Sequence, residues 1–410
     1  RIYSGATVLR LSRQTPGPGW LLEVVHTDAR LRKRQGEPLR LSARRVVLAA
    51  GSFGSTEILL RSRAPKQLQL SEMLGRGFST NGDMIAVAWG LQAAADAGAG
   101  AGAKASAGAR GDGAGNASAT GADPGNGTDT DTDTAVGPTI SAMLDLRKLD
   151  IRDSRDASHA GLVVQSLVIP ASLRRLYEEV VTTTHALNTL DRADPTVHAC
   201  SDRIDPCAVS AEAIERTLAV AMMGDEGAAG RLELREASEG DAAIDVRWPE
   251  LREHPLFRRQ LALLDELLAR SVGGDRSDGG ADAGAVDPGP DEGSHRDAIA
   301  LPNPLWSPLR EPIASMFGAD KGPLVTVHPL GGCRMGKDRC HGVVDHLGRV
   351  FDGLDADPEG VHDGLVVLDG AIVPRALGIN PALTIAALAL RASETLVSVW
   401  GFGEQGPAQA

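Results

Sequence analysis

The run Arg45-Val46-Val47-Leu48-Ala49-Ala50-Gly51-Ser52-Phe53-Gly54-Ser55 decides the fold. Its unbroken apolar part, residues 46–50, is typical of a parallel strand that is covered on both faces, and the glycines end that strand. Residues 56–63 then predict a helix. A strand, a glycine turn and a helix in this order bring backbone N–H groups to a helix N-terminus, where an anionic or polar ligand can bind. The run therefore predicts an α/β fold with a ligand site at this turn.

Further strands and helices are predicted on both sides of this run. Before it, residues 3–11 and 20–26 predict a hairpin, because the cluster Pro16-Gly17-Pro18-Gly19 separates two apolar runs. After it, residues 136–306 mix short strand-like runs with amphipathic helical ones, which is an α+β pattern. The predicted strands are residues 161–169, 232–234, 244–248 and 364–368, and the predicted helices are residues 211–223, 256–268 and about 381–400. Residues 84–89 form a further run that receives no element.

Two stretches, residues 93–134 and 273–294, cannot form a core. The first contains none of the large apolar side chains and the second contains only Val286, so neither can offset its ordering entropy by burial. They also hold most of the net charge of −12. The rest of the chain is close to neutral, and only 3% of all residues are aromatic, which excludes the basic, stacking surface of a nucleic-acid binder. We therefore expect two disordered segments beside about two domains.

The sequence shows neither a membrane-spanning run nor a signal peptide. No apolar run reaches the ~18 residues of a transmembrane helix, since Arg391 and Glu394 interrupt the last helical pattern. The chain begins at Arg1, so we expect a truncated N-terminus and leave the compartment open, with a cytoplasmic location favoured. The cysteine spacing lacks the C-x-x-C pattern of a zinc site, which predicts no metal and reduced thiols at Cys200, Cys207, Cys333 and Cys340.

Three segments carry motifs. They are Ala-Ala-Gly-Ser-Phe-Gly-Ser-Thr-Glu at 49–57, Val-His-Pro-Leu-Gly-Gly-Cys at 327–333, and Val-Leu-Asp-Gly at 367–370 running on to Gly-Ile-Asn-Pro at 378–381. In this order they resemble the glucose-methanol-choline (GMC) family of FAD-dependent oxidoreductases, and within it the cholesterol oxidase branch. The resemblance implies an FAD-binding Rossmann-like domain with an α+β substrate-binding domain. The FAD-binding domain is expected to be incomplete, because no G-x-G-x-x-G turn occurs before residue 51.

The resemblance also implies a domain order and an activity. Residues 1–90 would begin the FAD-binding domain, 91–134 would be a disordered insertion, 135–323 the substrate-binding domain with a disordered loop at 273–294, and 324–410 the rest of the FAD-binding domain. The intact enzyme would oxidise a small-molecule alcohol by hydride transfer to flavin, with a 3-hydroxysteroid favoured as substrate. A GMC dehydrogenase or oxidase of another lipid or alcohol, and a truncated remnant without catalysis, stay open as alternatives. The oligomeric state is not predicted.

His328 and Asn380 are the predicted catalytic pair. Oxidation of an alcohol removes the hydroxyl proton as well as the hydride, and a neutral imidazole is suited to accept that proton. The resemblance implies that the Asn380 side chain lies beside His328 at the substrate hydroxyl. A buried histidine bonded to a carbonyl is the alternative for His328. For Asn380 the alternative is a helix N-cap followed by Pro381, and such a helix would direct its positive end at a reduced flavin.

A set of FAD-binding residues follows from the same resemblance. Gly370 would let the cofactor approach the backbone while Asp369 accepts hydroxyl hydrogen bonds, although a type I turn also explains this pair. Val8 would touch the adenine ring, where the sequence alone predicts a core position. The full predicted set is Val8, Gly51, Ser52, Asn81, Gly82, Asp369, Gly370, Pro381 and Ala382.

Gln165 is the predicted substrate-binding residue and a departure from the family. The run Val164-Gln165-Ser166-Leu167-Val168-Ile169-Pro170 resembles the cholesterol oxidase segment in which a glutamate moves a steroid double bond. An amide cannot shuttle a proton at neutral pH, so the sequence predicts alcohol oxidation without steroid isomerisation. A shift of the alignment by one residue would put Ser166 in that place.

Overall fold

The computed structural model has a mixed α/β fold, which confirms the predicted fold class. The chain divides into two compact units: unit 1 is residues 1–83, 223–258 and 326–410, and unit 2 is residues 84–222 and 259–325. Residues 223–258 thus group with the first unit, whereas the sequence placed them in the substrate-binding domain. The predicted disordered stretches lie outside the described residues. These are 2–28, 30, 33–63, 68–89, 140, 142–147, 161–167, 218–235, 243–248, 251, 254–272, 299–302 and 326–402.

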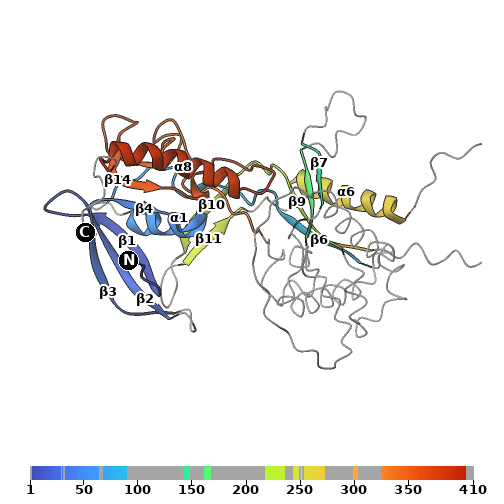
Figure 1. The fold of residues 1–410 in the computed structure, drawn as a ribbon, viewed down its shortest axis with the longest axis horizontal. Helices are drawn as coiled ribbons and strands as arrows, with labels where there is room; N and C mark the ends of the chain where they lie inside the picture. Colours follow the sequence, from blue (N-terminus) through green and yellow to red (C-terminus); the bar gives the residue numbers. More distant parts are fainter. Residues whose placement is uncertain are drawn as a thin grey trace, which may run out of the picture. The chain divides into compact units, whose positions relative to one another are not determined.

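The centre of unit 1 is a small sheet with a helix on each face (Figure 1). β4 (Val46–Leu48) pairs in parallel with β14 (Val361–Val367), which pairs on its other side with antiparallel β13 (Arg349–Phe351). Leu365 and Val367 of β14 pack with α1 (Gly51–Ser62), while Val366 packs with α8 (Ala382–Val399). Alternating side chains of one strand therefore join both helices to the core. The predicted parallel strand is confirmed, although Val47 on its second face is 50% exposed.

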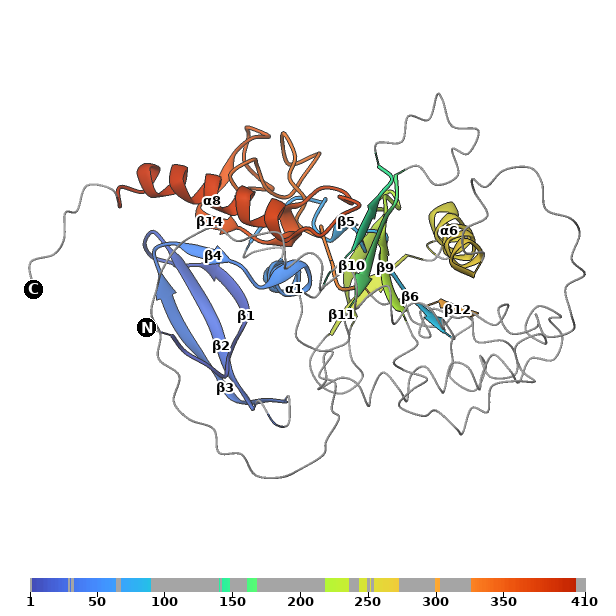
Figure 2. The same cartoon turned by 45° about the vertical axis from the view of Figure 1, so that its right-hand side comes forward.

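An antiparallel sheet packs against α1 in the same unit (Figure 2). It consists of β1 (Ala6–Arg13), β2 (Trp20–Asp28) and β3 (Lys33–Ala43), and its first two strands confirm the predicted hairpin. Leu11 and Trp20 are buried in the core that also contains Leu59 of α1. The sequence missed β3, because this edge strand is rich in exposed and charged residues and shows no apolar alternation.

A third sheet of unit 1 leads to the functional site. It has the order β11-β10-β5, with β5 (Arg76–Phe78) at one edge beside β10 (Gly230–Arg235) and β11 (Ala243–Arg247) at the other. The strands predicted at 232–234 and 244–248 are confirmed by β10 and β11. β5 ends one residue before the segment that carries most of the polar site residues.

Unit 2 contains a sheet of five strands in the order β12-β6-β9-β8-β7. The helix predicted at 211–223 is wrong for its last part, where the structure has a central strand. The run Leu-Ala-Val-Ala-Met-Met there is a short apolar segment, and periodicity alone cannot tell such a segment from a buried helix. The elements are β6 (Met84–Trp89), β7 (Met143–Asp145), β8 (Val163–Leu167), β9 (Leu218–Met223) and β12 (Ile299–Pro302), while α6 (Pro255–Val272) confirms the helix predicted at 256–268.

Helix α1 begins at Gly51, five residues before the predicted start at Thr56. The glycine and serine residues that read as a turn form its first turn, because Asp369 supplies the missing N-terminal acceptor. The Gly51 N–H donates to Asp369 Oδ2 at 3.0 Å, across 318 positions of sequence. The ligand site expected at this helix N-terminus therefore already holds a protein carboxylate.

Helix α8 confirms the long helix predicted at about 381–400. Within the part of the chain that the structure describes, it is the one helix long and apolar enough to cross a membrane by length and composition. Its two buried residues, Ala392 and Leu396, pack with Leu347 and Val366. Leu383 and Leu390 are 82% and 62% exposed.

Candidate active site

The site is built on one tight turn, residues 79–83, between β5 and β6. Ser79 bridges to Leu330 through two backbone hydrogen bonds of 2.9 and 3.0 Å, which tie the turn to the segment after His328. Asn81 and Gly82 have φ of 59° and 63°, in the left-handed region. A Cβ on Gly82 would lie 2.5 Å from the carbonyl oxygen of Gly224, so this position requires glycine.

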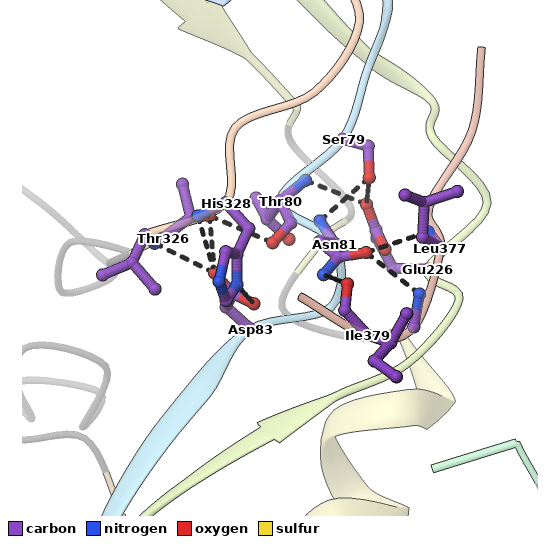
Figure 3. A network of polar contacts seen from close by, with 11 residues as sticks. Ser79, Thr80, Asn81, Asp83, Glu226, Thr326, His328, Leu377 and Ile379 are labelled. Atoms are coloured by element: carbon purple, nitrogen blue, oxygen red, sulfur yellow. Dashed lines mark hydrogen bonds and ion pairs between the residues drawn. The ribbon is translucent and has the colours of Figure 1, made fainter. Parts of the chain in front are cut away.

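Asp83 holds the segment that contains His328 (Figure 3). Its Oδ2 accepts hydrogen bonds from the backbone N–H of Val327 at 2.9 Å and of His328 at 3.0 Å. The same oxygen accepts from Thr326 Oγ1 at 2.9 Å, and its Oδ1 lies 2.9 Å from His328 Nδ1. One carboxylate, 5% exposed, therefore fixes both the backbone and the ring of His328.

This pairing sets the tautomer of His328. An ionised carboxylate can only accept hydrogen bonds, so the proton shared with Asp83 belongs to Nδ1 of the neutral imidazole. Nε2 then presents its lone pair, and among the described residues no group hydrogen-bonds to it. The side chain is 16% exposed, so a small molecule can reach it. The alternative of a histidine bonded to a carbonyl does not describe this geometry.

Asn81 holds the segment that leads to Asn380 (Figure 3). Its Oδ1 accepts from the backbone N–H of Leu377 at 2.9 Å and of Gly378 at 3.0 Å, and its Nδ2 donates to the carbonyl of Ile379 at 2.9 Å. Asn81 is fully buried, and all these contacts are within the protein. Two residues of one turn, Asn81 and Asp83, thus anchor the two segments that carry the predicted catalytic pair.

Glu226 supports the same turn from the segment between β9 and β10. Its Oε1 accepts from Ser79 Oγ at 2.5 Å and from the backbone N–H of Thr80 at 2.9 Å. Ser79 Oγ in turn accepts from the backbone N–H of Asn81 at 2.9 Å. Burial raises the pKa of the Glu226 carboxyl, which is 2% exposed.

A second cluster joins four of the predicted FAD-binding residues. Asp369 Oδ2 accepts from the Gly51 N–H and from Ser55 Oγ, and its Oδ1 accepts from the Ala371 N–H at 2.8 Å. Ser52 Oγ donates to the carbonyl of Pro329 at 2.7 Å. The Gly331 N–H donates to the Gly370 carbonyl at 3.0 Å. The structure therefore brings Gly51, Ser52, Asp369 and Gly370 together beside the segment that follows His328.

The start of α8 differs from the predicted one. Pro381 occupies the N-cap position, the helix begins at Ala382, and no side chain caps it, so Asn380 as N-cap is wrong. Asn380 is half-buried. The first turn carries no acidic side chain, and Ala382 is exposed. The partial positive charge of this helix end is therefore not offset by an acidic side chain of its own first turn.

Val8 and Gln165 lie in separate surroundings. Val8 is half-buried and packs against the core cluster that contains Leu11, as the sequence alone predicts. Gln165 belongs to unit 2, is 4% exposed, and donates from Nε2 to Met143 Sδ at 3.4 Å. The assignments of Val8 to the adenine ring and of Gln165 to the substrate stay predictions.

Sequence reasoning missed Asp83, Thr326 and Glu226. An Asp directly after Asn-Gly reads as an ordinary turn residue, and its histidine lies 245 positions away. Among the described residues no group of three or more His, Cys, Asp or Glu could hold a metal ion. Of the four cysteines, Cys333 and Cys340 are free thiols, and Cys200 and Cys207 lie outside the described residues.

Comparison with known proteins finds a family that part of the chain resembles. Residues 227–389, which contain both His328 and Asn380, match the family model described as GMC oxidoreductase. This region is similar to the C-terminal domain of GMC oxidoreductases. The match covers less than half of the chain and does not include the 79–83 turn. It implies FAD as the cofactor.

Individual relatives are similar over shorter stretches. A cholesterol oxidase of Mycobacterium tuberculosis is 35% identical over 111 residues, which cover 24% of this chain and 17% of that protein. The 6'''-hydroxyparomomycin C oxidase of Streptomyces lividus is 39% identical over 71 residues, covering 17% of this chain and 11% of that protein. A crystal structure of pyridoxine 4-oxidase from Mesorbium loti superimposes with a TM-score of 0.46 at 16% identity, covering 95% of this chain and 57% of that one. The chain thus matches less than a fifth of the length of these curated relatives.

Proposed function

We propose that this protein oxidises the CH–OH group of a small-molecule alcohol to a ketone or aldehyde. The observation that carries the proposal is the Asp83–His328 pair, which holds the ring so that Nε2 presents a lone pair. The family match at residues 227–389 supports the class of reaction. When bound, FAD would supply the acceptor for the hydride that leaves the alcohol carbon.

The residues of the chain would handle the proton. His328 Nε2 would accept the hydroxyl proton, and the Asp83 carboxylate at Nδ1 would stabilise the imidazolium that forms. Asn380 would donate a hydrogen bond to the substrate oxygen and orient it toward His328. The 79–83 turn would keep these two groups in register, because Asn81 and Asp83 lie on the same rigid turn.

The residues present fit a flavin. Among the described residues nothing lies within 4 Å of where a Cβ of Gly51 would be, so the backbone there is open to a ligand. The start of α8 at Pro381 and Ala382, whose first turn carries no acidic side chain, suits the partial negative charge of a flavin ring. The open backbone at Gly51 and the start of α8 would hold the cofactor, and the buried Ser52 and Gly370, which bond to Pro329 and Gly331, would keep that backbone in place. Asp369 would act mainly as their support, since both its oxygens already accept from the protein.

A 3-hydroxysteroid is the favoured substrate, and another lipid or alcohol is the alternative. The cholesterol oxidase likeness supports the first, and the 6'''-hydroxyparomomycin C oxidase likeness supports the second. With a 3-hydroxy-5-ene steroid, Gln165 could not move the proton that conjugates the product. The unconjugated ketone would then accumulate, and Gln165→Glu would accelerate conjugation without accelerating oxidation.

Anaerobic mixing of the flavin-loaded protein with a panel of alcohols tests the proposal. The panel contains a 3-hydroxysteroid, a long-chain primary alcohol and an aminoglycoside with a free hydroxymethyl group. Bleaching of the flavin absorption by one of them, with the matching carbonyl product, is the expected result. A flavin that no alcohol reduces would leave a binding protein without this catalysis, and the proposal would be wrong.

A further inference from the structure

Glu226 is a buried carboxyl group that the proposed proton transfer does not use. It is 2% exposed, and its two hydrogen bonds both go to one oxygen, Oε1. The Ser79 hydroxyl donates to Glu226 Oε1, and its oxygen accepts from the Asn81 N–H. Oε1 therefore receives two hydrogens, and a proton on the carboxyl group can only reside on Oε2.

The other oxygen shows which protonation state this site favours. Oε2 is buried, and the structure shows no hydrogen-bond partner for it in the described part of the chain. The charged group that faces Glu226 is its neighbour Asp225, which has the same sign and pairs with Arg375 at 2.6 Å. An ionised carboxylate here would keep a buried charge without a cation, which costs far more than a buried neutral acid. Burial is the largest effect and raises the pKa of Glu226, the hydrogen bonds from Ser79 and Thr80 lower it by less, and Asp225 adds a small upward contribution, so the net shift is upward.

Two contacts connect Glu226 to both anchors of the site. Through Ser79 it reaches the backbone of Asn81, which binds residues 377–379. Through Thr80 it reaches the backbone whose carbonyl oxygen lies 3.0 Å from Thr326 Oγ1, beside the Asp83 contacts. Loss of the Oε1 contacts would therefore loosen the turn under His328 and Asn380 together.

We propose that Glu226 is a positioning residue that holds the 79–83 turn as a neutral acid, and that its ionisation releases the turn and switches the site off. The catalytic part of this inference rests on the proposed alcohol oxidation. The protonation state and the hold on the turn do not, because they are properties of the folded chain alone.

The sign of the pH effect follows from the raised pKa. A carboxyl group whose pKa is higher in the folded than in the unfolded chain stabilises the fold fully below the unfolded pKa of ~4.3. This contribution is lost as the pH rises through the folded pKa. Glu226→Gln keeps a carbonyl oxygen for Ser79 and Thr80 and cannot ionise, so it removes this pH dependence.

The first test is thermal unfolding between about pH 5 and pH 10. Relative to wild type, E226Q should gain melting temperature as the pH rises, whereas E233Q, the same change at a half-exposed carboxylate of β10, should follow wild type. E226A should lose about 2–8 °C at all these pH values, because Ser79 and Thr80 lose their acceptor. Parallel pH profiles of wild type and E226Q would overturn the proposal.

The second test is the rate of flavin reduction by alcohol over the same pH range. Wild type should lose about tenfold in rate per pH unit above the folded pKa, with kcat affected more than KM, and E226Q should retain most of its rate there. An equal alkaline loss in E226Q would remove Glu226 from the site's pH response. If no alcohol reduces the flavin, the proposed function fails while the unfolding test still decides the protonation of Glu226.

Discussion

Two aspartates organise unit 1 in opposite ways. Asp83 and Asp369 are both buried, and each gathers several N–H and O–H donors from segments far apart in sequence. Both oxygens of Asp369 accept hydrogen bonds, from Gly51, Ser55 and Ala371. This cluster, which we call the Asp369 joint, has a structural role. In Asp83, Oδ2 accepts from the backbone, whereas Oδ1 binds the ring of His328.

The difference shows how the same chemistry yields either scaffold or function. A carboxylate that gathers only backbone and hydroxyl donors fixes a fold, because none of its partners can change protonation at neutral pH. A carboxylate that also holds an imidazole fixes a tautomer, and it leaves the far ring nitrogen as a base. The identity of one partner separates the two aspartates, rather than their burial or number of bonds.

The strongest test of this comparison removes the imidazole. His328→Ala should lower the rate of flavin reduction by on the order of 10² to 10⁴, as expected for loss of a positioned proton acceptor. His341→Ala is the matched control, because His341 also pairs with an aspartate, Asp338, at 2.6 Å but is 56% exposed. Rapid mixing with alcohol measures both. An unchanged rate in H328A would remove His328 from the chemistry.

A smaller loss is expected when Asp83 keeps its shape but loses its charge. In Asp83→Asn the amide N–H₂ faces either the backbone donors of Val327 and His328 or the ring nitrogen Nδ1, and one set of contacts fails. Loss of hydrogen bonds to a charged group costs about 1.5–3 kcal/mol, which corresponds to roughly 10- to 100-fold in rate. Asp338→Asn is the control. A D83N protein that reacts at the wild-type rate would show that Asp83 is scaffold only.

The corresponding substitution at Asp369 should lower the stability of the fold rather than the rate of the reaction. Asp369→Asn turns its amide hydrogens toward at least one of its donors, which costs about 1–3 kcal/mol in the free energy of unfolding. Cys333 gives a local readout, because its N–H donates to the Ala371 carbonyl and burial raises the pKa of its thiol to about 12. Urea unfolding and thiol labelling should both show a loosened joint in D369N. Labelling of Cys333 as slow as in wild type would contradict this.

Much of the fold can be predicted from the sequence because it depends on local patterns. The hairpin, β4, α6 and α8 each have an apolar period or a turn signal of their own. The errors occur where tertiary partners decide. α1 starts early because a remote Asp369 caps it, β9 is a strand because neighbouring strands bury it, and β3 pairs as an edge strand that lacks alternation.

The site was predictable to the extent that it lies in motifs. His328 and Asn380 lie in recognisable sequence motifs, and so do the residues of the second cluster, Gly51, Ser52, Asp369 and Gly370. Asp83 and Glu226 were not predictable, because single acidic residues acquire their roles from partners 245 and 147 positions away. The structure adds these supporting residues, which determine the tautomer of His328 and the position of the turn beneath it.

The smallest expected effect concerns Ser52, which links the surroundings of Asp369 to those of Asp83 and His328. Ser52, in the first turn of α1 beside the Asp369 joint, is 2% exposed and donates to the Pro329 carbonyl next to His328. Ser52→Ala should cost about 0.5–1.5 kcal/mol of stability, while Thr395→Ala, which removes an exposed hydroxyl bonded to a helix carbonyl, should cost less. If Asp83 and Asp369 organise independent regions, the unfolding free energies of S52A and D83N should add within about 0.5 kcal/mol in the double variant. A larger coupling would mean that the scaffold joint also sets the position of the base, and the distinction between the two aspartates would have to be given up.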